Sequence, residues 1–308
     1  MNMKCISCKK PAEIKITQGF CAECFLKHYQ RRVEKTIKKF KLIQKNDRVL
    51  VAVSGGKDSL SCADVLNELG FDIAVLHIDV GVKRCTNERS KQVVEKFCKE
   101  RNIPFHFTSF EDFFDIEDIN KFFKIAKRPI CATCGMLKRA LFNKFARENG
   151  FTKIATGHCA DDIVKYFFKS MLAGDKDSIL WLSKLKPITP SSYPKIVTRI
   201  RPLFEMLEIE NLAYTKFRNI VVAGCTMCSY FQRKDKWTEI LRDLDKKIPD
   251  FKIKIARTLE KIEIVLPNIQ EKEKIKECLV CGEPTSQEIC AVCKIKQKLS
   301  KRNSGKIS

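Results

Sequence analysis

The segment at positions 54–59 combines the residue types that bind phosphate. It consists of Ser54, Gly55, Gly56, Lys57, Asp58 and Ser59. It follows an apolar run ending in Ala52 and Val53 and precedes a run with helical spacing. Adjacent glycines let successive backbone N–H groups converge on an anion at a helix N-terminus, and the serines and lysine add donors and positive charge. The segment predicts a site for nucleotide phosphates, although it lacks the Gly-x4-Gly-Lys-Ser/Thr pattern of Walker loops.

Eight of the 16 cysteines form two sets of paired Cys-x-x-Cys motifs, one near each end of the chain. The sets are Cys5, Cys8, Cys21 and Cys24, and Cys278, Cys281, Cys290 and Cys293. Four thiolates at such spacing suit a closed, tetrahedral structural zinc site, with redox dithiols as the alternative. We expect two zinc modules that need their metal to fold, because such short segments bury little apolar surface.

Two further cysteine pairs lie between these sets, Cys131 with Cys134 and Cys225 with Cys228. The first pair opens a segment of helical spacing whose apolar stripe leaves Lys138 on another face. Three thiolates would hold a [4Fe-4S] cluster with one iron open, whereas four would form a closed cluster or a third zinc site. Both alternatives fit the spacing.

The 308-residue chain carries 59 Lys and Arg against 37 Asp and Glu, a formal net charge of +22. Such a basic excess is typical of proteins that bind a polyanion such as nucleic acid, although compositional drift toward lysine also produces it. No apolar run approaches about 18 residues, and the N-terminus has no secretory hydrophobic region. We expect a cytoplasmic protein without a membrane segment, whose thiols bind metal or act in catalysis rather than form disulfides.

The central region alternates between strand and helix patterns. Predicted strands at 49–54, 71–79, 103–110 and 152–158 alternate with predicted helices at 59–70, 89–102, 134–150 and 160–174. Near-continuous apolar strands joined by helices predict an α/β fold, with a parallel sheet covered on both faces. Ligands bind such sheets at the carboxyl ends of the strands, where the phosphate-binding segment, His77 and Gly157-His158 lie. We assign Cys62, Cys85 and Cys98 to the core.

Three domains follow from this pattern: a zinc module at 1–28, a catalytic domain at 29–271 and a second zinc module at 272–308. A basic helix over 28–42 joins the first two. Its apolar residues, Val33, Ile37 and Phe40, predict one packed side. The cationic side is either a solvated face or a stripe that contacts RNA.

The motif order resembles a known enzyme family. The Ser-Gly-Gly-Lys-Asp-Ser segment resembles the PP-loop of the ATP pyrophosphatases. The full set of motifs resembles the TtcA/TtuA branch of tRNA 2-thiolation enzymes, close to the cytosolic wobble-uridine thiolases. In chain order, the motifs are a zinc module, the PP-loop, Leu-His-Ile-Asp, Cys-x-x-Cys-Gly-x-x-Lys-Arg, Thr-Gly-His-x-x-Asp-Asp, a late cysteine and a second zinc module. The resemblance covers nearly the whole chain. It implies an adenine nucleotide alpha hydrolase-like sheet flanked by two zinc-ribbon modules.

The resemblance also implies a reaction and a role for each matching residue. ATP, with Mg, adenylates the C2 oxygen of a uridine, and a sulfide held on the open iron of a [4Fe-4S] cluster displaces AMP. The implied nucleotide site comprises Ala52, Val53, Ser54, Gly55, Gly56, Lys57, Asp58, Ser59, His77, Ile78, Lys138 and Gly157. The implied cluster ligands are Cys131, Cys134 and either Cys228 or Cys225, and the implied catalytic groups beside the base are His158 and Asp161.

This chain departs from the family pattern in two places. The Gly-His-Asn-x-Asp-Asp-Glu motif has Cys159 in place of Asn and Ile163 in place of the last acid. The late cysteine is doubled: Cys228-Ser229-Tyr230 matches the local family pattern, but the spacing of Cys225 to the next helix fits nearly as well.

By resemblance, the substrate is tRNA, most closely (5-methyl)uridine 54, followed by uridine 34 and cytidine 32. Sulfur would come from a ubiquitin-like carrier protein or from free sulfide, and a homodimer is implied. Two other functions compete with thiolation. A PP-loop amidating enzyme or lysidine synthase would need neither Cys131 nor Cys134, and a non-enzymatic zinc-ribbon nucleic-acid binder would leave the PP-loop unexplained.

Overall fold

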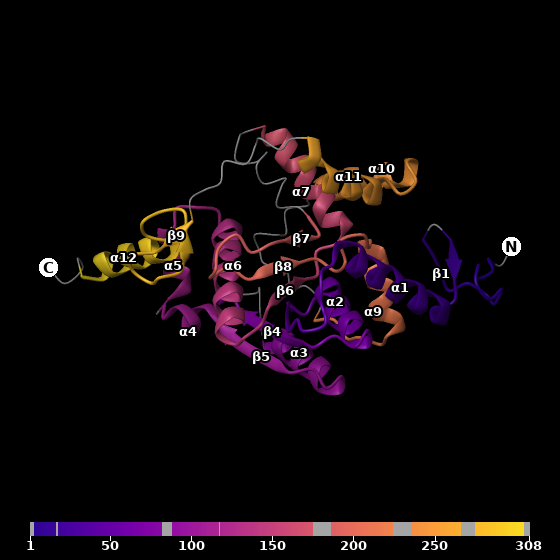
Figure 1. The fold of residues 1–308 in the computed structure, drawn as a ribbon, viewed down its shortest axis with the longest axis horizontal. Coiled ribbons are helices and arrows are strands. Elements are labelled where there is room, and N and C mark those ends of the chain that lie inside the picture. Colours follow the sequence, from indigo (N-terminus) through magenta and orange to yellow (C-terminus); the bar gives the residue numbers. More distant parts are fainter. Residues whose placement is uncertain are drawn as a thin grey trace.

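The computed structural model describes residues 3–16, 18–81, 88–116, 118–174, 186–223, 236–265 and 275–304. The two ends of the chain lie at opposite ends of the long axis of the molecule, and the sheet lies between them (Figure 1). The two cysteine-rich segments are therefore separate, and the sheet carries the region between them.

Among the described residues, six strands form the central sheet, in the order β5-β4-β3-β6-β8-β7. Their bounds are β3 Val49–Ala52, β4 Ile73–Asp79, β5 Phe105–Ser109, β6 Lys153–Thr156, β7 Ile188–Thr189 and β8 Thr198–Ile200. All neighbouring strands are parallel except β7 and β8. The first four strands confirm the predicted parallel α/β sheet. The last two have no predicted counterpart, because runs of two and three residues are too short to show a strand pattern.

Four helices confirm the predicted helical segments: α2 Lys57–Glu68, α3 Glu88–Glu100, α6 Ile130–Glu148 and α7 Ala160–Ala173. The other described helices are α1 Ala22–Phe40, α4 Phe110–Phe114, α5 Ile119–Ile125, α9 Glu208–Phe217, α10 Lys236–Lys247, α11 Phe251–Val265 and α12 Ala291–Ser304. Two small hairpins accompany the terminal cysteines: β1 Ile14–Lys15 with β2 Gly19–Phe20, and β9 Lys276–Glu277 with β10 Pro284–Thr285. No described helix has the length and apolarity that crossing a membrane requires.

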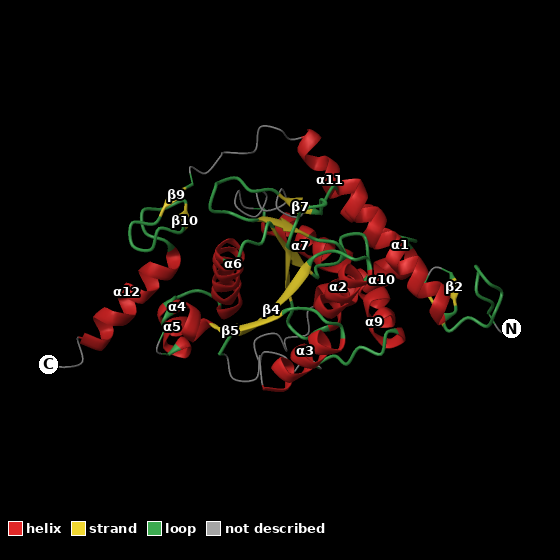
Figure 2. Ribbon diagram, turned by 60° about the horizontal axis from the view of Figure 1, so that its bottom comes forward, coloured by secondary structure: helices red, strands yellow, loops and turns green. Residues whose placement is uncertain are grey.

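Alternate residues of each strand face opposite helical layers, as the period of two in a strand requires. Val49 and Val51 belong to the core shared with α1, α2, α3 and α9, whereas Leu50 belongs to the core shared with α4, α5 and α6. Figure 2 shows α6 on one side of the sheet and α2, α3 and α9 on the other. Cys62 and Cys98 are buried in the first core, as predicted, and Cys85 lies outside the described residues.

Helix α1 begins inside the N-terminal cysteine module and continues into the catalytic domain. It starts directly after Cys21 and ends before Lys41, which has a left-handed backbone conformation. Val33 and Ile37 are buried, as the apolar spacing predicts. The ring of Tyr29 stacks on Tyr214 of α9 at 4.2 Å between centroids. The domain boundary proposed at 28/29 therefore lies within one continuous helix.

The C-terminal module attaches to the opposite layer. Glu283 accepts two hydrogen bonds from the guanidinium of Arg147 on α6, at 3.1 and 2.5 Å. Ile295 and Leu299 of α12 are buried in the core that contains α5 and α6. This attachment places the second cysteine module on the side of the sheet that carries Cys131 and Cys134.

Candidate active site

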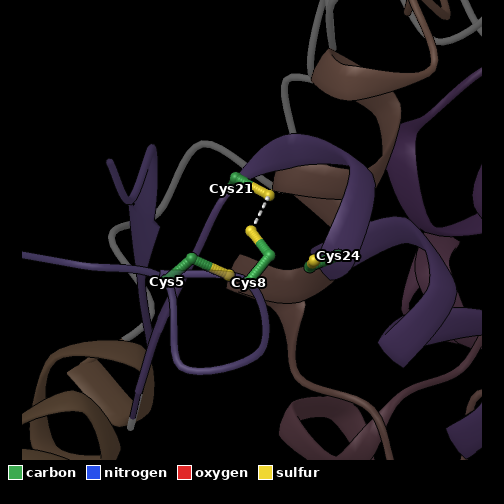
Figure 3. A group of neighbouring side chains, drawn as sticks. All are labelled: Cys5, Cys8, Cys21 and Cys24. Carbon is green, nitrogen blue, oxygen red and sulfur yellow. Dashed lines mark hydrogen bonds between the residues drawn. The ribbon is translucent and has the colours of Figure 1, made fainter. Parts of the chain in front are cut away.

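Each terminal set of cysteines converges on one point. In both sets, all four Sγ atoms lie within 4.8 Å of one another. Cys8 and Cys21 are 3.6 Å apart at sulfur (Figure 3), and Cys281 and Cys290 are 3.8 Å apart. A tetrahedral zinc ion with Zn–S bonds of about 2.3 Å separates its sulfur ligands by about 3.8 Å. The two groups of thiols therefore fit the predicted structural zinc sites.

We expect a Cys8→Ser variant to bind one zinc ion fewer per chain than the unmodified protein, and to melt at a lower temperature. The reason is that a structural site that loses one of four thiolates also loses the metal-derived folding free energy of its module. Metal analysis of the purified protein and thermal unfolding measure the two effects. Cys62→Ala, at a buried thiol outside both sets, is the control. An unchanged zinc content in Cys8→Ser would contradict the assignment.

The predicted phosphate-binding segment forms a turn between β3 and α2. Gly55 has φ +85°, a conformation that favours glycine, and a Cβ there would lie 3.0 Å from Ala223. The Ser59 hydroxyl donates to the Gly56 carbonyl at 3.0 Å and accepts from the Ser54 N–H at 3.2 Å. The loop is thus preorganised by its own hydroxyls. Its exposed residues, Ser54 and Gly56, leave their surface open to a ligand.

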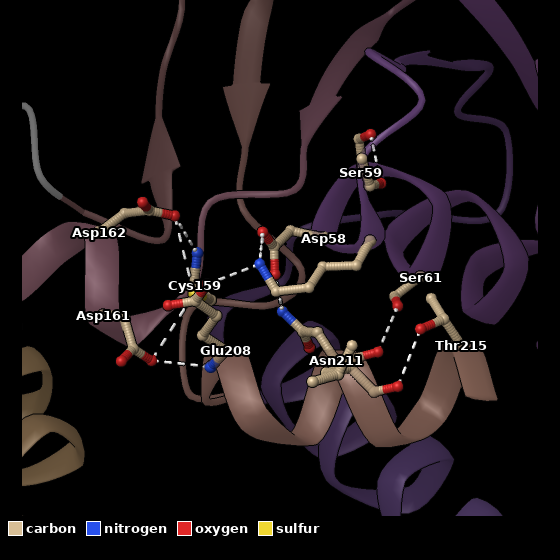
Figure 4. A network of polar contacts seen from close by, with 12 residues as sticks. Asp58, Ser59, Ser61, Cys159, Asp161, Asp162, Glu208, Asn211 and Thr215 are labelled. Carbon is tan, nitrogen blue, oxygen red and sulfur yellow. Dashed lines mark hydrogen bonds and ion pairs between the residues drawn. The ribbon is translucent and has the colours of Figure 1, made fainter. Parts of the chain in front are cut away.

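Lys57 supplies a positive charge at the first turn of α2. Its Nζ lies 2.7 Å from Glu208 of α9 and 3.0 Å from Asp58. Burial opposes the charged form, but the two carboxylates outweigh it and raise the pKa of Lys57. The carboxylate of Asp58 is in turn held at 2.8 Å by the amide of Asn211 (Figure 4). The lysine is therefore protonated at every physiological pH.

Gly157, at the turn between β6 and α7, packs directly against the PP-loop helix. A Cβ at this position would lie 2.6 Å from the carbonyl oxygen of Asp58 and 2.8 Å from the Cα of Ser59. These are backbone atoms, which cannot rotate away as a side chain can. The turn therefore fixes the height of the α2 N-terminus above the sheet.

We expect Gly157→Ala to weaken ATP binding by at least about ten-fold, because the added methyl must displace the first turn of α2, on which the phosphate-binding N–H groups depend. Titration calorimetry with ATP measures the effect. Gly70→Ala is the matched control: it adds a methyl that meets nothing within 4 Å, at φ +77°, and should lower stability while leaving ATP affinity unchanged. Equal ATP affinity in both variants would show that the packing is irrelevant to the site.

His77 and His158 have different environments. The Val53 carbonyl lies 2.8 Å from Nδ1 of His77, which places the ring proton on Nδ1 because a carbonyl only accepts. His77 is buried, and burial lowers its pKa, as does, more weakly, the charge of Lys138 on α6. His158 has an exposed ring 2.9 Å from the Thr156 hydroxyl, yet dense surrounding protein desolvates it and, with Arg201, lowers its pKa to about 4. Both rings are neutral at pH 7.

The two adjacent aspartates of the Gly-His-x-x-Asp-Asp motif have different partners. Asp161 accepts the N–H of Glu208 at 2.7 Å and pairs with Lys252 of α11 at 2.7 Å. Asp162 accepts the N–H of Cys159 at 3.1 Å, at the start of α7 (Figure 4). Burial raises the pKa of Asp162, and the nearby Asp161 adds to this effect. Asp161 thus connects α7 to α9 and α11, whereas Asp162 accepts a hydrogen bond at the start of its own helix.

Cys131 and Cys134 are the second and fifth residues of α6, which begins after Pro129 at its N-cap. Cys131 is exposed, and Cys134 is half-buried. Residues three apart lie on the same face of a helix, and the positive end of the helix dipole favours thiolates there. Cys225 and Cys228, the predicted sources of the third ligand, lie outside the described residues. The described pair has the donor type, spacing and accessibility that a thiolate-ligated cluster requires.

Comparison with known proteins agrees with this geometry. The model of the PP-loop domain family matches residues 25–222. The tRNA-5-methyluridine(54) 2-sulfurtransferase of Pyrococcus horikoshii is 37% identical over 95% of this chain and 93% of its own length, and that of Thermotoga maritima is 31% identical over 98% and 99%. The solved structure of the U34-tRNA thiolase NcsA from Methanococcus maripaludis with its [4Fe-4S] cluster is 27% identical, has a TM-score of 0.79 and covers 97% of both chains. The chain belongs to the PP-loop tRNA thiolase family.

Membership in the tRNA thiolase family confirms the resemblance predicted from the sequence, and it makes the protein an enzyme. It favours thiolation over the amidating and non-enzymatic alternatives. The PP-loop follows β3, and the helix that carries Cys131 and Cys134, α6, leads into β6, the strand next to β3. Lys138 on the same helix is close enough to His77 to lower its pKa.

The thiolase site also includes residues that the motifs did not indicate. Asn211, fully buried on α9, accepts the Tyr29 hydroxyl at 2.7 Å and donates to Asp58 at 2.8 Å. Glu208 reaches Lys57 from the start of the same helix. No motif marked these two residues: Leu207 stands at the N-cap of α9 in place of a usual capping residue, and the sequence of the helix does not indicate which loop it packs against.

Proposed function

We propose that this protein catalyses the ATP-dependent 2-thiolation of uridine in tRNA, with (5-methyl)uridine 54 as the target. The observation that carries the proposal is that a PP-loop and an accessible cysteine pair share the carboxyl edge of one sheet. The choice of position 54 is supported by the names of relatives at 30–37% identity, compared with a uridine-34 thiolase at 27%.

In the first step, the C2 oxygen of the uridine attacks the α-phosphorus of ATP and pyrophosphate leaves. The PP-loop N–H groups, Ser54, Ser59 and Lys57 bind the departing pyrophosphate, and a Mg ion bound with ATP would neutralise part of its charge. The adenine lies on the β4 side, beside Ile78. Preorganised positive charge stabilises the negative charge that develops on the leaving group, so this loop supplies most of the acceleration.

We assign the role of base in that step to Asp162, in place of Asp161, which the resemblance implies as the catalytic group. As O2 bonds to phosphorus, the uridine ring must lose its N3 proton to remain neutral, and a nearby carboxylate accepts it. A carboxyl group with a raised pKa is a stronger base than an ordinary one, and Asp162 has this property. Asp161 has a positioning role, because α9 and Lys252 already engage its two oxygens. His158, which is neutral, lies at the same edge and is available to contact the base.

Cys131, Cys134 and one of Cys228 or Cys225 would hold a [4Fe-4S] cluster. When bound, the cluster supplies the sulfur that replaces O2 at the C2 carbon, and AMP leaves with that oxygen. The chain's own contribution is to hold two thiolates at the N-terminus of α6, next to Lys138, which we assign to the nucleotide phosphates. The two terminal cysteine sets would each hold a zinc ion and serve folding and tRNA contact.

The sulfur source and location complete the proposal. A depression of about 400 Å³ lies directly before Cys131, lined by Lys124, Lys127 and Arg128 with the apolar side chains of Phe123 and Ile130. A cationic depression beside the cysteines suits an anionic sulfur source, either free hydrosulfide or the thiocarboxylate end of a ubiquitin-like carrier.

We place the enzyme in the cytoplasm, with a homodimer as its expected assembly. The Caenorhabditis elegans relative named cytoplasmic tRNA 2-thiolation protein 1 is 29% identical over 96% of the chain.

The test is mass spectrometry of tRNA nucleosides from a deletion strain. Loss of 2-thio-5-methyluridine, restored by the intact gene, is the expected result. Loss of a 2-thiolated wobble uridine instead would move the target to position 34. An unchanged set of thiolated nucleosides would refute the proposed function.

A further inference from the structure

The β6–β8 half of the sheet carries a group of cations that the proposed ATP site does not use. Arg199 lies on β8, and Arg201 follows it. The parallel register pairs Ala155 of β6 with Ile200 of β8, so Arg201 emerges level with Thr156, just before Gly157 and His158. Arg139 approaches from α6, one residue after Lys138. The three arginines therefore come from two elements, β8 and α6, that meet at one edge of the sheet.

The contacts of this cation group include neutral acceptors. Arg201 donates Nη1 to the Thr189 hydroxyl at 3.1 Å and to the Lys186 carbonyl. Within the described part of the chain, the half-buried Arg199 side chain makes no hydrogen bond or ion pair. Burial and Arg139 lower the pKa of Arg199, and burial and Arg199 lower that of Arg201 to about 10. Partly desolvated cations that repel one another create a local field that favours an anion.

The sheet topology indicates which anion this is. The PP-loop follows β3, and its neighbour β4 carries the residues assigned to adenine. β8 lies two strands away on the other side of β3, about 10 Å from it at about 4.8 Å per strand. An anion at β8 is therefore displaced from the pyrophosphate and lies on the side from which the acceptor must enter. In the proposed reaction that acceptor is RNA, whose phosphates are the anions it brings.

We propose that Arg199 and Arg201, with Arg139 beside them, bind a backbone phosphate of the tRNA nucleotide that flanks the modified uridine. The inference rests on the proposed function, because it takes RNA as the acceptor. Tyr166 of α7 supports it: its ring is 52% exposed, and its charge environment includes both Asp162 and Arg139. Exposed aromatic rings beside guanidinium groups are the usual platform for unstacked RNA bases.

Arg199→Gln tests the subsite, with Lys96→Gln, an exposed cation on α3, as the matched control. We expect Arg199→Gln to raise the Kd for tRNA about ten-fold, the loss expected for one charge-assisted hydrogen bond. The slope of log Kd against log salt should fall by roughly 0.7–0.9, the value for one phosphate contact. ATP affinity should not change. Lys96→Gln should alter none of these quantities.

A stem-loop RNA with one neutral methylphosphonate beside the target uridine identifies the phosphate. Each flanking position is tested against both the unmodified protein and Arg199→Gln. At the contacted position, the modification should weaken binding to the unmodified protein about ten-fold and leave binding to Arg199→Gln unchanged. The inference would be overturned if the methylphosphonate and Arg199→Gln weakened binding additively at every position. It would also be overturned if Arg199→Gln bound tRNA as tightly as Lys96→Gln does, or if Arg199→Gln lost affinity for ATP. Binding is measured without turnover, so the absence of thiolation would refute the proposed function and leave this result standing.

Discussion

Cys131→Ala and Cys134→Ala are each expected to abolish tRNA thiolation, by at least about a thousand-fold, while tRNA-dependent release of pyrophosphate from ATP continues. The two thiols lie at the N-terminal end of α6, whereas the groups assigned to adenylation lie on the PP-loop and the start of α7. Removal of a sulfur ligand therefore separates the two half-reactions. Nucleoside mass spectrometry after reaction measures thiolation, and a pyrophosphate assay measures adenylation.

Cys98→Ala is the control for this pair, because Cys98 is buried in the opposite core. It should lower stability and leave both half-reactions intact in the folded protein. Retention of 2-thiouridine formation in Cys131→Ala and Cys134→Ala would show that thiolation does not need these thiols, and it would contradict their assignment as cluster ligands. Loss of pyrophosphate release together with thiolation would place the cysteines in the adenylation site instead.

Asp162→Asn is expected to lower kcat for adenylation by about 10²–10⁴-fold, the usual contribution of a general base, with little change in Tm. Asp161→Asn should do the reverse. It weakens a partly buried ion pair with Lys252 and the contact with the first N–H of α9, so it should destabilise the fold by about 2 kcal/mol and leave the chemistry largely intact. Stopped-flow pyrophosphate release and thermal unfolding measure the two quantities. Equal losses of kcat in both variants would contradict the division of roles.

The same assignment predicts a pH dependence. Asp162 acts as a base only when ionised, and burial raises its pKa in the folded protein. The adenylation rate should therefore fall as the pH decreases through this raised pKa, at a higher pH than an ordinary aspartate would give. The acidic limb should disappear in Asp162→Asn. His158 should not contribute at neutral pH, since its pKa is lowered to about 4.

Much of this architecture is predictable from the sequence, because its signals are local. The four strands β3 to β6 are apolar runs with clear ends, and the terminal cysteines carry their spacing in the chain itself. The division of labour between Asp161 and Asp162 is not predictable, because it depends on α9 and α11, which lie 47 and 91 residues further along the chain at Glu208 and Lys252. Two adjacent acids look identical in a motif, and only the packing of distant helices distinguishes them.

The cation group on β8 was missed for a related reason. Arg199 lies on a three-residue strand with no periodic pattern and Arg201 directly follows that strand, in a chain where 59 Lys and Arg make any single arginine uninformative. Their proximity to Arg139 and His158 arises from the order of the strands. Similarly, the sequence presents Asn211 as an ordinary polar residue of a helix, although its side chain is fully buried and connects Tyr29 to Asp58 by hydrogen bonds.

The continuity of α1 has a practical consequence for dissecting the molecule. Cys24 and Tyr29 lie on the same helix. Two hydrogen bonds, from Tyr29 to Asn211 and from Asn211 to Asp58, connect this helix to the ATP-binding turn. Loss of zinc from the N-terminal module should therefore disturb the nucleotide site as well as the module itself. Removal of the first 28 residues would leave Tyr29 at a frayed helix end, and it would weaken the support that this residue gives to the ATP-binding turn.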